Sequence, residues 1–182
     1  MRKIFIDCGY YRGKGIRLFK KRPEYDDSFE FFAFDPNKMP DNHDEEMKKK
    51  NITFFNKALW TFDGEISFYA SGRVYGQANS VFPNPSKPRR EKKRTIECID
   101  FDKWIKDNFS PDDYIVVKMD IEGAEYDILY HMLNEGSIHY VDLMFVEYHY
   151  ERRPGTGRED FSKLRKRLKS ETNVKFTKAI EW

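Results

Sequence analysis

The chain has 182 residues, with 33 basic and 31 acidic side chains, so its formal net charge is only +2. A chain of this length buries a substantial core as one ordinary domain, and we expect a single domain over residues 1–182. The nearly balanced charge does not mark the chain as a nucleic-acid-binding or membrane-binding protein. The two cysteines, Cys8 and Cys98, stand too far apart and too isolated for a disulfide scaffold or a zinc site.

The N-terminal segment lacks the hydrophobic length of a targeting signal. Only three apolar residues in a row precede Asp7, whereas a secretory signal needs about 7–15 and a transmembrane helix about 20. We therefore expect a soluble cytoplasmic protein, without membrane contact and with both cysteines reduced.

Strands and helices are expected to alternate through the first half of the chain. Short apolar runs predict strands at residues 3–7, 29–34 and 52–55. Amphipathic or polar spacing predicts helices at residues 13–22 and 41–50. The Asp63-Gly64 turn between two apolar segments predicts a β-hairpin. The irregular residues 71–94 contain glycines and prolines and predict a long loop on the acceptor side.

The second half of the chain continues the alternation. Strands are predicted at residues 95–99, 114–119, 141–146 and 174–182. Helices are predicted at residues 101–109, 124–133 and 159–169. Several of the strands are apolar on both faces, which is typical of a parallel sheet covered by helices. The sequence therefore predicts an α/β fold with a mostly parallel central sheet and helices on both faces.

Polar side chains follow four of the buried strands, at the points where the strands end. These ends are Asp7-Cys8-Gly9, Asp35, Asp120-Ile121-Glu122 and Glu147-Tyr148-His149. Ligands of an open parallel sheet bind at the carboxyl ends of its strands. We therefore expect the functional site at this edge of the sheet.

The first two strand ends have the features of an adenosyl-ligand site. Gly9 permits a tight turn and a close approach of the backbone to a ligand, and Gly13 begins a helix whose amides can bind a carboxylate. The spacing differs from the Gly-x-Gly-x-x-Gly and phosphate-loop patterns that bind pyrophosphates. Asp35 can accept both hydroxyls of a ribose. A glycine turn with only a structural role is the alternative.

The segment Lys118-Met-Asp-Ile-Glu-Gly-Ala-Glu125, followed by an apolar helix, resembles the signature of the FkbM-type methyltransferases. Further similarity lies in residues 4–9, 34–37, 56–59 and 145–149. The resemblance implies a Rossmann-like class I methyltransferase fold, S-adenosylmethionine as donor, and methylation of a hydroxyl on a sugar or related product. The residues expected to bind the donor are Asp7, Gly9, Tyr11, Gly13, Asp35, Asn56, Ala58 and Asp120.

The expected catalytic residues are Asp120, Glu147 and His149, which sit at neighbouring strand ends. A sugar hydroxyl needs a base or a metal ion to sharpen its attack. His149 is the predicted base because an unperturbed imidazole has a pKa near 6.5. A solvent-facing loop histidine is the alternative. Asp120 and Glu147 can instead hold a divalent cation, Mg²⁺ or Mn²⁺.

The acceptor is expected to contact Tyr75, Gln77, Asn79 and Glu122. Glu122 can also be structural, together with Glu125, by anchoring the turn and the helix start. The basic run 87–94 is either a solvated loop or a clamp for an anionic acceptor. The remaining histidines, His43, His131 and His139, show no ligand spacing.

Three functions remain open from the sequence. The leading hypothesis is an S-adenosylmethionine-dependent O-methyltransferase that acts on a glycan or nucleotide sugar. The second keeps the donor but makes RNA or protein the acceptor, through the basic residues 87–94. The third is a catalytically inactive cofactor-binding interaction module, suggested by the Tyr10-Tyr11-Arg12 sequence, which replaces the small residues more usual in the family.

Overall fold

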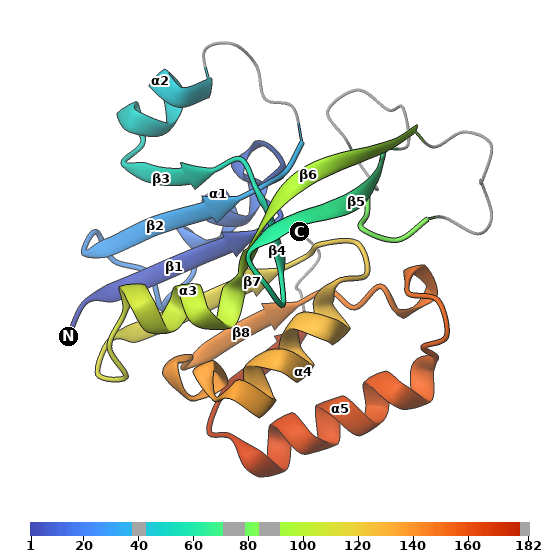
Figure 1. Ribbon diagram of the computed structural model, residues 1–182. Helices are drawn as coiled ribbons and strands as arrows, with labels where there is room; N and C mark the ends of the chain where they lie inside the picture. The colour runs from blue at the N-terminus through green and yellow to red at the C-terminus, as the bar shows by residue number, and fades with distance from the viewer. Residues whose placement is uncertain (38–42, 71–78, 84–91, 179–182) are drawn as a thin grey trace.

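The computed structural model describes residues 1–37, 43–70, 79–83 and 92–178, which form a central parallel sheet with helices on both faces (Figure 1). The six strands lie in the order β3-β2-β1-β7-β8-β9. Their bounds are Lys3–Cys8 (β1), Phe29–Phe34 (β2), Ile52–Phe55 (β3), Tyr114–Met119 (β7), Leu143–Val146 (β8) and Lys175–Lys178 (β9). All their pairings are parallel. The predicted α/β fold, Rossmann-like and mostly parallel, is confirmed.

The chain order along this sheet reverses between β1 and β7. From β1 the chain runs outward through β2 and β3, and it returns to the other side of β1 as β7. Ligands of such sheets bind beside the carboxyl ends of the strands at this switch point.

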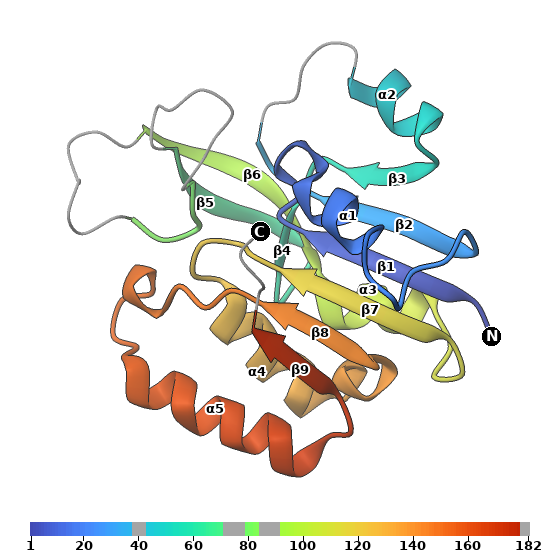
Figure 2. The same cartoon turned by 180° about the vertical axis from the view of Figure 1, so that it is seen from behind.

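The helices cover the two faces of the sheet in two groups. Their bounds are Lys14–Phe19 (α1), His43–Lys49 (α2), Phe101–Asn108 (α3), Glu125–Glu135 (α4) and Arg158–Glu171 (α5). Helices α1 and α2 share a core with one face, whereas α3, α4 and α5 pack against the other. Figures 1 and 2 show α3 and α4 in front of the sheet in one view and α1 in front in the other.

The alternating side chains of β1 connect these two cores. Phe5 faces α1, where its ring stacks on that of Phe19 with centroids 4.2 Å apart. Ile4 and Ile6 face the opposite way, toward α3 and α4. Side chains on successive strand residues point to opposite faces. A strand with large apolar side chains on both faces, as at Ile4, Phe5 and Ile6, therefore fits between two covered faces.

A second, smaller sheet corrects the predicted hairpin. It consists of β4 (Ala58–Trp60), β5 (Gly64–Ala70) and β6 (Lys92–Asp100), in the order β4-β6-β5. Strand β6 lies between the other two, parallel to β4 and antiparallel to β5. The segments on either side of the Asp63-Gly64 turn therefore do not pair with each other.

The contacts of Asp63 tie its turn to a distant part of the chain. One carboxylate oxygen accepts a hydrogen bond from the backbone N–H of Asp100 at 3.0 Å, and the other lies 2.9 Å from the Lys103 ammonium. These bonds fasten the turn to the end of β6 and the start of α3. The predicted long loop is also shorter than expected, because β6 begins at Lys92 and Tyr69 forms a β-bridge with Ser80.

Several predicted boundaries agree with the structure to the residue. Strands β2, β3 and β7 have the predicted ends, and the other helices and strands of the central sheet differ at their ends by a few residues. The final strand is described to Lys178, and residues 179–182 lie outside the described part. Short 3₁₀ turns occur at Tyr11–Gly13, Ser137–Tyr140 and Tyr150–Arg152. Within the described ranges, no helix combines the length and apolarity needed to cross a bilayer.

Replacing Phe19 by Ala is expected to lower the free energy of unfolding by roughly 3–5 kcal/mol, because the fully buried ring anchors α1 on β1. Chemical denaturation measures the change. Phe62→Ala is the matched control, since its ring is 46% exposed and should contribute little. Equal losses in the two variants would show that α1 is not held by this stack.

Candidate functional site

A cavity of about 440 Å³ opens at the carboxyl ends of β1, β2 and β7. Its volume falls within the range of about 300–1,000 Å³ that is typical of small-molecule sites. The turns after the strands supply its polar wall, with residues such as Gly9, Asp35 and Asp120. The second sheet and the segment between β5 and β6 supply the apolar wall, which includes Leu59, Phe68 and Val81.

Most of the donor residues predicted from the sequence meet at this cavity. Those that line it are Gly9, Tyr11, Asp35, Ala58 and Asp120. The other predicted donor residues, Asp7, Gly13 and Asn56, support the same turns from behind.

The predicted acceptor and catalytic residues that the structure describes lie at or next to the same cavity. Asn79, Glu122, Asp120 and Glu147 line it. His149 lies behind two of them, with its Nε2 4.0 Å from Asp120 Oδ1 and 3.7 Å from Glu147 Oε1. Tyr75 and Gln77 lie outside the described residues, as does most of the basic run 87–94.

Gly9 lets the first turn pack directly on the end of β7. It has a φ of +86°, and a Cβ at this position would come 2.0 Å from the backbone oxygen of Asp120. Its N–H donates a 2.9 Å hydrogen bond to the carbonyl of Phe34. The turn is thereby tied to β2 and pressed against β7, so only glycine fits here.

The residues after Gly9 adopt a backbone that ordinary residues seldom use. Tyr11 and Arg12 have φ values of 26° and 58°, and Gly13 follows at 69°. Left-handed non-glycine residues cost energy and gather at ligand-binding turns. The Tyr11 N–H donates a 3.0 Å hydrogen bond to Asp35 Oδ2, which holds the turn against the end of β2. Helix α1 then begins at Lys14, one residue later than predicted.

Asp35 is the centre of a hydrogen-bond network after β2. Its Oδ1 accepts bonds from the backbone N–H and side-chain amide of Asn37 at 2.9 and 2.8 Å. Burial raises the pKa of this carboxyl, against the effect of those bonds. The Asn56 amide donates to the carbonyls of Asp35 and Asn37, so Asn56 shapes the loop rather than the cavity wall. Asn79 donates a 2.6 Å bond to Asn37 Oδ1 and joins the second sheet to this network.

A buried ion pair lies beneath the cavity floor. The Lys118 side chain is 4% exposed and that of Asp7 is 0% exposed, with Lys118 Nζ 3.1 Å from Asp7 Oδ1. The ammonium also donates a 2.7 Å hydrogen bond to the carbonyl of Gly9 and lies 3.6 Å from Asp120 Oδ2. Burial raises the pKa of Asp7 to about 6, although Lys118 opposes the shift. Lys118 lines the cavity, but no role for it was predicted from the sequence.

Glu125 anchors the turn after β7, as the sequence suggested. Its side chain is fully buried, and its two oxygens accept the backbone N–H groups of Ile121 and Gly123, each at 3.0 Å. Oε1 also lies 3.0 Å from His149 Nδ1. The buried carboxylate therefore orients the imidazole and leaves its Nε2 facing Asp120 and Glu147.

His149 carries a strongly perturbed pKa. Burial, the largest influence, disfavours its charged form, but the hydrogen bond to Glu125 and the charges of Glu125, Glu122 and Asp120 outweigh burial and raise the pKa to about 9. At neutral pH the imidazole is therefore a cation among carboxylates. Such a shift directly behind two residues of a cavity wall is typical of a functional site.

The same residues offer ligand atoms for a divalent cation. One atom each from Asp120, Glu122 and His149 lie within 4.8 Å of one another. Carboxylate oxygens suit Mg²⁺ or Mn²⁺, whereas a protonated His149 opposes metal binding, because a ligand imidazole must be neutral.

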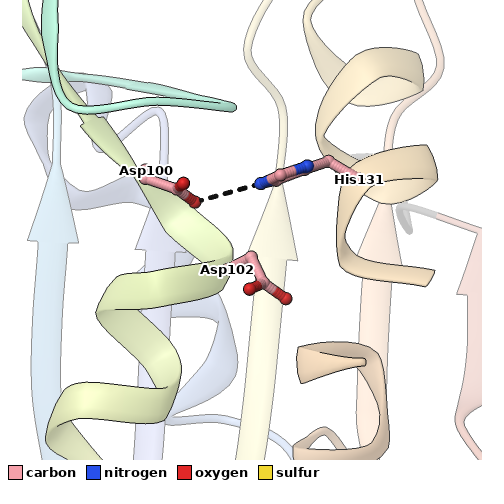
Figure 3. Close-up of side chains that lie close together, drawn as sticks. All are labelled: Asp100, Asp102 and His131. Carbon is pink, nitrogen blue, oxygen red and sulfur yellow. Dashed lines mark hydrogen bonds and ion pairs between the residues drawn. The ribbon is translucent and has the colours of Figure 1, made fainter. Parts of the chain in front are cut away.

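Asp100, Asp102 and His131 form a second cluster, but its polar atoms have structural partners (Figure 3). Asp100 caps α3 by accepting the Lys103 N–H at 3.2 Å, and it lies 3.2 Å from His131 Nε2. The buried Asp102 accepts the Ser137 N–H at 3.0 Å and pairs with Lys106 at 2.7 Å. In Figure 3 His131 is directed at Asp100 while the Asp102 carboxylate points to a different side. The cluster fastens α3 to α4 and to the turn that follows it.

Comparison with known proteins identifies a family. The family model described as the methyltransferase FkbM domain matches residues 7–174, a span that includes every described residue of the cavity wall. The chain has no significant match among curated proteins or solved structures.

The pair of His149 with Glu125 predicts that the free energy of unfolding depends on pH. The folded-state pKa of about 9 lies above the ordinary 6.5, so the pair stabilises the fold fully below about pH 6.5 and loses this contribution as pH rises through 9. The expected loss is on the order of 3 kcal/mol, measured by denaturant unfolding across this range. His149→Gln should remove the slope. An unchanged slope would assign it to other groups.

Proposed function

This chain belongs to the FkbM methyltransferase family, and we propose that it is an S-adenosylmethionine-dependent O-methyltransferase acting on a sugar or glycan hydroxyl. One observation carries the proposal. The turn after β1 and the signature segment after β7 pack against each other at Gly9 and together wall one cavity that also holds Asp35. We further propose that residues 1–182 form a single domain.

The cavity has the polar groups that an adenosyl donor requires. Asp35 contributes a carboxylate to the cavity wall, and such a carboxylate is suited to the hydroxyls of a ribose. Its Oδ2 already accepts one hydrogen bond, from the Tyr11 N–H. Ala58, Leu59, Phe68 and Val81 give an apolar surface suited to the adenine ring. Asp120 adds a second carboxylate to the wall, and its negative charge would favour a cationic donor.

The acceptor side has the groups needed to receive a proton. When bound, S-adenosylmethionine would supply an electrophilic methyl group for the acceptor oxygen, with S-adenosylhomocysteine as the leaving group. Glu147 and Asp120 lie where they can hold the acceptor hydroxyl. His149, oriented through Nδ1 by Glu125, takes the hydroxyl proton on Nε2 once the imidazole is neutral.

A charged acceptor is the second candidate. Lys92, Lys93 and Arg94 of the basic run are exposed on β6, and Arg94 donates a 3.0 Å hydrogen bond to the carbonyl of Pro36 at the cavity wall. These cations could bind an anionic part of an acceptor, such as a nucleotide-sugar pyrophosphate or the phosphates of RNA. The carboxylates within the cavity favour a neutral hydroxyl at the point of transfer.

The donor assignment predicts the effect of Asp35→Ala. Loss of a charge-assisted bond to the ribose should weaken binding of S-adenosylmethionine and S-adenosylhomocysteine roughly 10- to 150-fold. Calorimetry measures the affinities, with the exposed Asp112→Ala as control. A folded Asp35→Ala protein with wild-type affinity would exclude Asp35 as the ribose ligand, and NAD binding without either adenosyl ligand would contradict the donor.

The base assignment predicts the effect of His149→Ala. Turnover should fall roughly 10²- to 10⁴-fold with donor affinity nearly unchanged, because the base acts on the acceptor side. Release of S-adenosylhomocysteine with a panel of neutral sugars provides the assay, and the exposed His139→Ala is the control. The wild-type rate should rise with pH toward about 9, as His149 loses its proton.

Treatment with a chelator distinguishes the two roles considered for His149, general base and metal ligand, on the same enzyme. Inactivation by chelator that Mg²⁺ or Mn²⁺ reverses would make Asp120, Glu122 and His149 metal ligands instead. Wild-type turnover of His149→Ala without any chelator effect would contradict both roles and leave acceptor positioning as the source of catalysis.

A further inference from the structure

We propose that Lys118 is a positioning residue for the donor, whose buried ammonium holds the Gly9 turn and the Asp120 carboxylate in the geometry that binds S-adenosylmethionine. The inference rests on the proposed function, because it concerns the binding of this donor.

The ammonium joins the two strand ends at the switch point of the sheet. Asp7 on β1 and Lys118 on β7 are direct partners in the strand register. Lys118 Nζ lies 3.1 Å from Asp7 Oδ1, 2.7 Å from the Gly9 carbonyl oxygen and 3.6 Å from Asp120 Oδ2. One side chain therefore fixes the end of β1, the turn that follows it and the first residue after β7.

The two charges of the pair have different surroundings. Asp7 lies under the turn against Gly15, where a Cβ would come 2.6 Å from its Oδ2, and it is not among the described residues that line the cavity. Lys118, Gly9 and Asp120 all line the cavity. Asp7 thus balances the buried ammonium, while the other interactions of Lys118 reach the wall that the donor would contact.

A purely structural ion pair would not need the contacts that Lys118 makes with the Gly9 carbonyl and with Asp120. Buried pairs can often be replaced by neutral residues of similar volume without loss of stability, whereas removal of one partner is strongly destabilising. The hydrogen bond to the Gly9 carbonyl sets the orientation of the turn whose backbone faces the ligand. Donor affinity should therefore depend on Lys118 even where stability does not.

Three variants separate the two roles by thermal unfolding and by calorimetry with S-adenosylmethionine and S-adenosylhomocysteine. Lys118→Met alone leaves Asp7 unpaired and should lower Tm by roughly 6–20 °C. The double variant Asp7→Asn with Lys118→Met should recover most of this loss but bind both ligands at least about tenfold more weakly. The double variant Asp7→Asn with Lys118→Gln retains an amide N–H that can donate a hydrogen bond to the Gly9 carbonyl. It should bind both ligands more tightly than the Met version, at a similar Tm.

Lys106→Met is the matched control, because it breaks the pair with Asp102, whose side chain is 6% exposed, outside the cavity. It should lower Tm and leave both affinities unchanged. The inference would be overturned, with the proposed function intact, by wild-type affinity in the Asp7→Asn, Lys118→Met protein. Equal affinities of the Met and Gln versions would have the same consequence. A wild-type protein that binds neither ligand would overturn the proposed function, and the inference with it.

Discussion

A lysine ammonium enclosed between β1 and β7 is the constraint on which the site depends. Its charge is almost completely removed from water, which is costly unless an opposite charge and hydrogen bonds compensate for it. Asp7, near the end of β1, and the carbonyl of Gly9, in the turn that follows, supply that compensation. Closing the sheet around this charge therefore also brings the first turn against the signature segment, where the cavity forms.

The parts of the fold that depend on local pattern could be predicted from the sequence. Strands β2 and β7 are mostly apolar runs, each with one charged residue, and polar residues flank them, so their ends agree with the structure to the residue. The second sheet depends instead on β6 inserting between two segments that are separated only by Asp63 and its neighbours. Local turn chemistry favoured a hairpin there, whereas the structure has the long-range pairing of β6 with both segments, accompanied by the contacts of Asp63 with Asp100 and Lys103.

In the candidate site, too, the features set by local sequence could be predicted, whereas those set by distant contacts could not. Acidic residues at strand ends located the cavity, because parallel strands bring their ends to one edge. The sequence could not tell which of these acids face a ligand and which face the interior, so Asp7 was grouped with Asp35. It also gave no separate signal for Lys118, because one lysine in an apolar run has no partner until the strands pair. The perturbed pKa of His149 likewise depends on Glu125, which its own helix buries.

The second sheet gives the two walls of the cavity separate foundations. Gly9, Asp35 and Asp120 are fixed by the pairing of the central strands, whereas Phe68, Asn79 and Val81 come from β5 and the segment bridged to it. Substitutions along β5 can therefore reshape one wall while the core of the main sheet stays intact. Because that wall includes the apolar surface proposed for the adenine ring, changes in the short outer sheet would alter how tightly the cavity holds its occupant without loosening the strands that position Asp35 and Asp120.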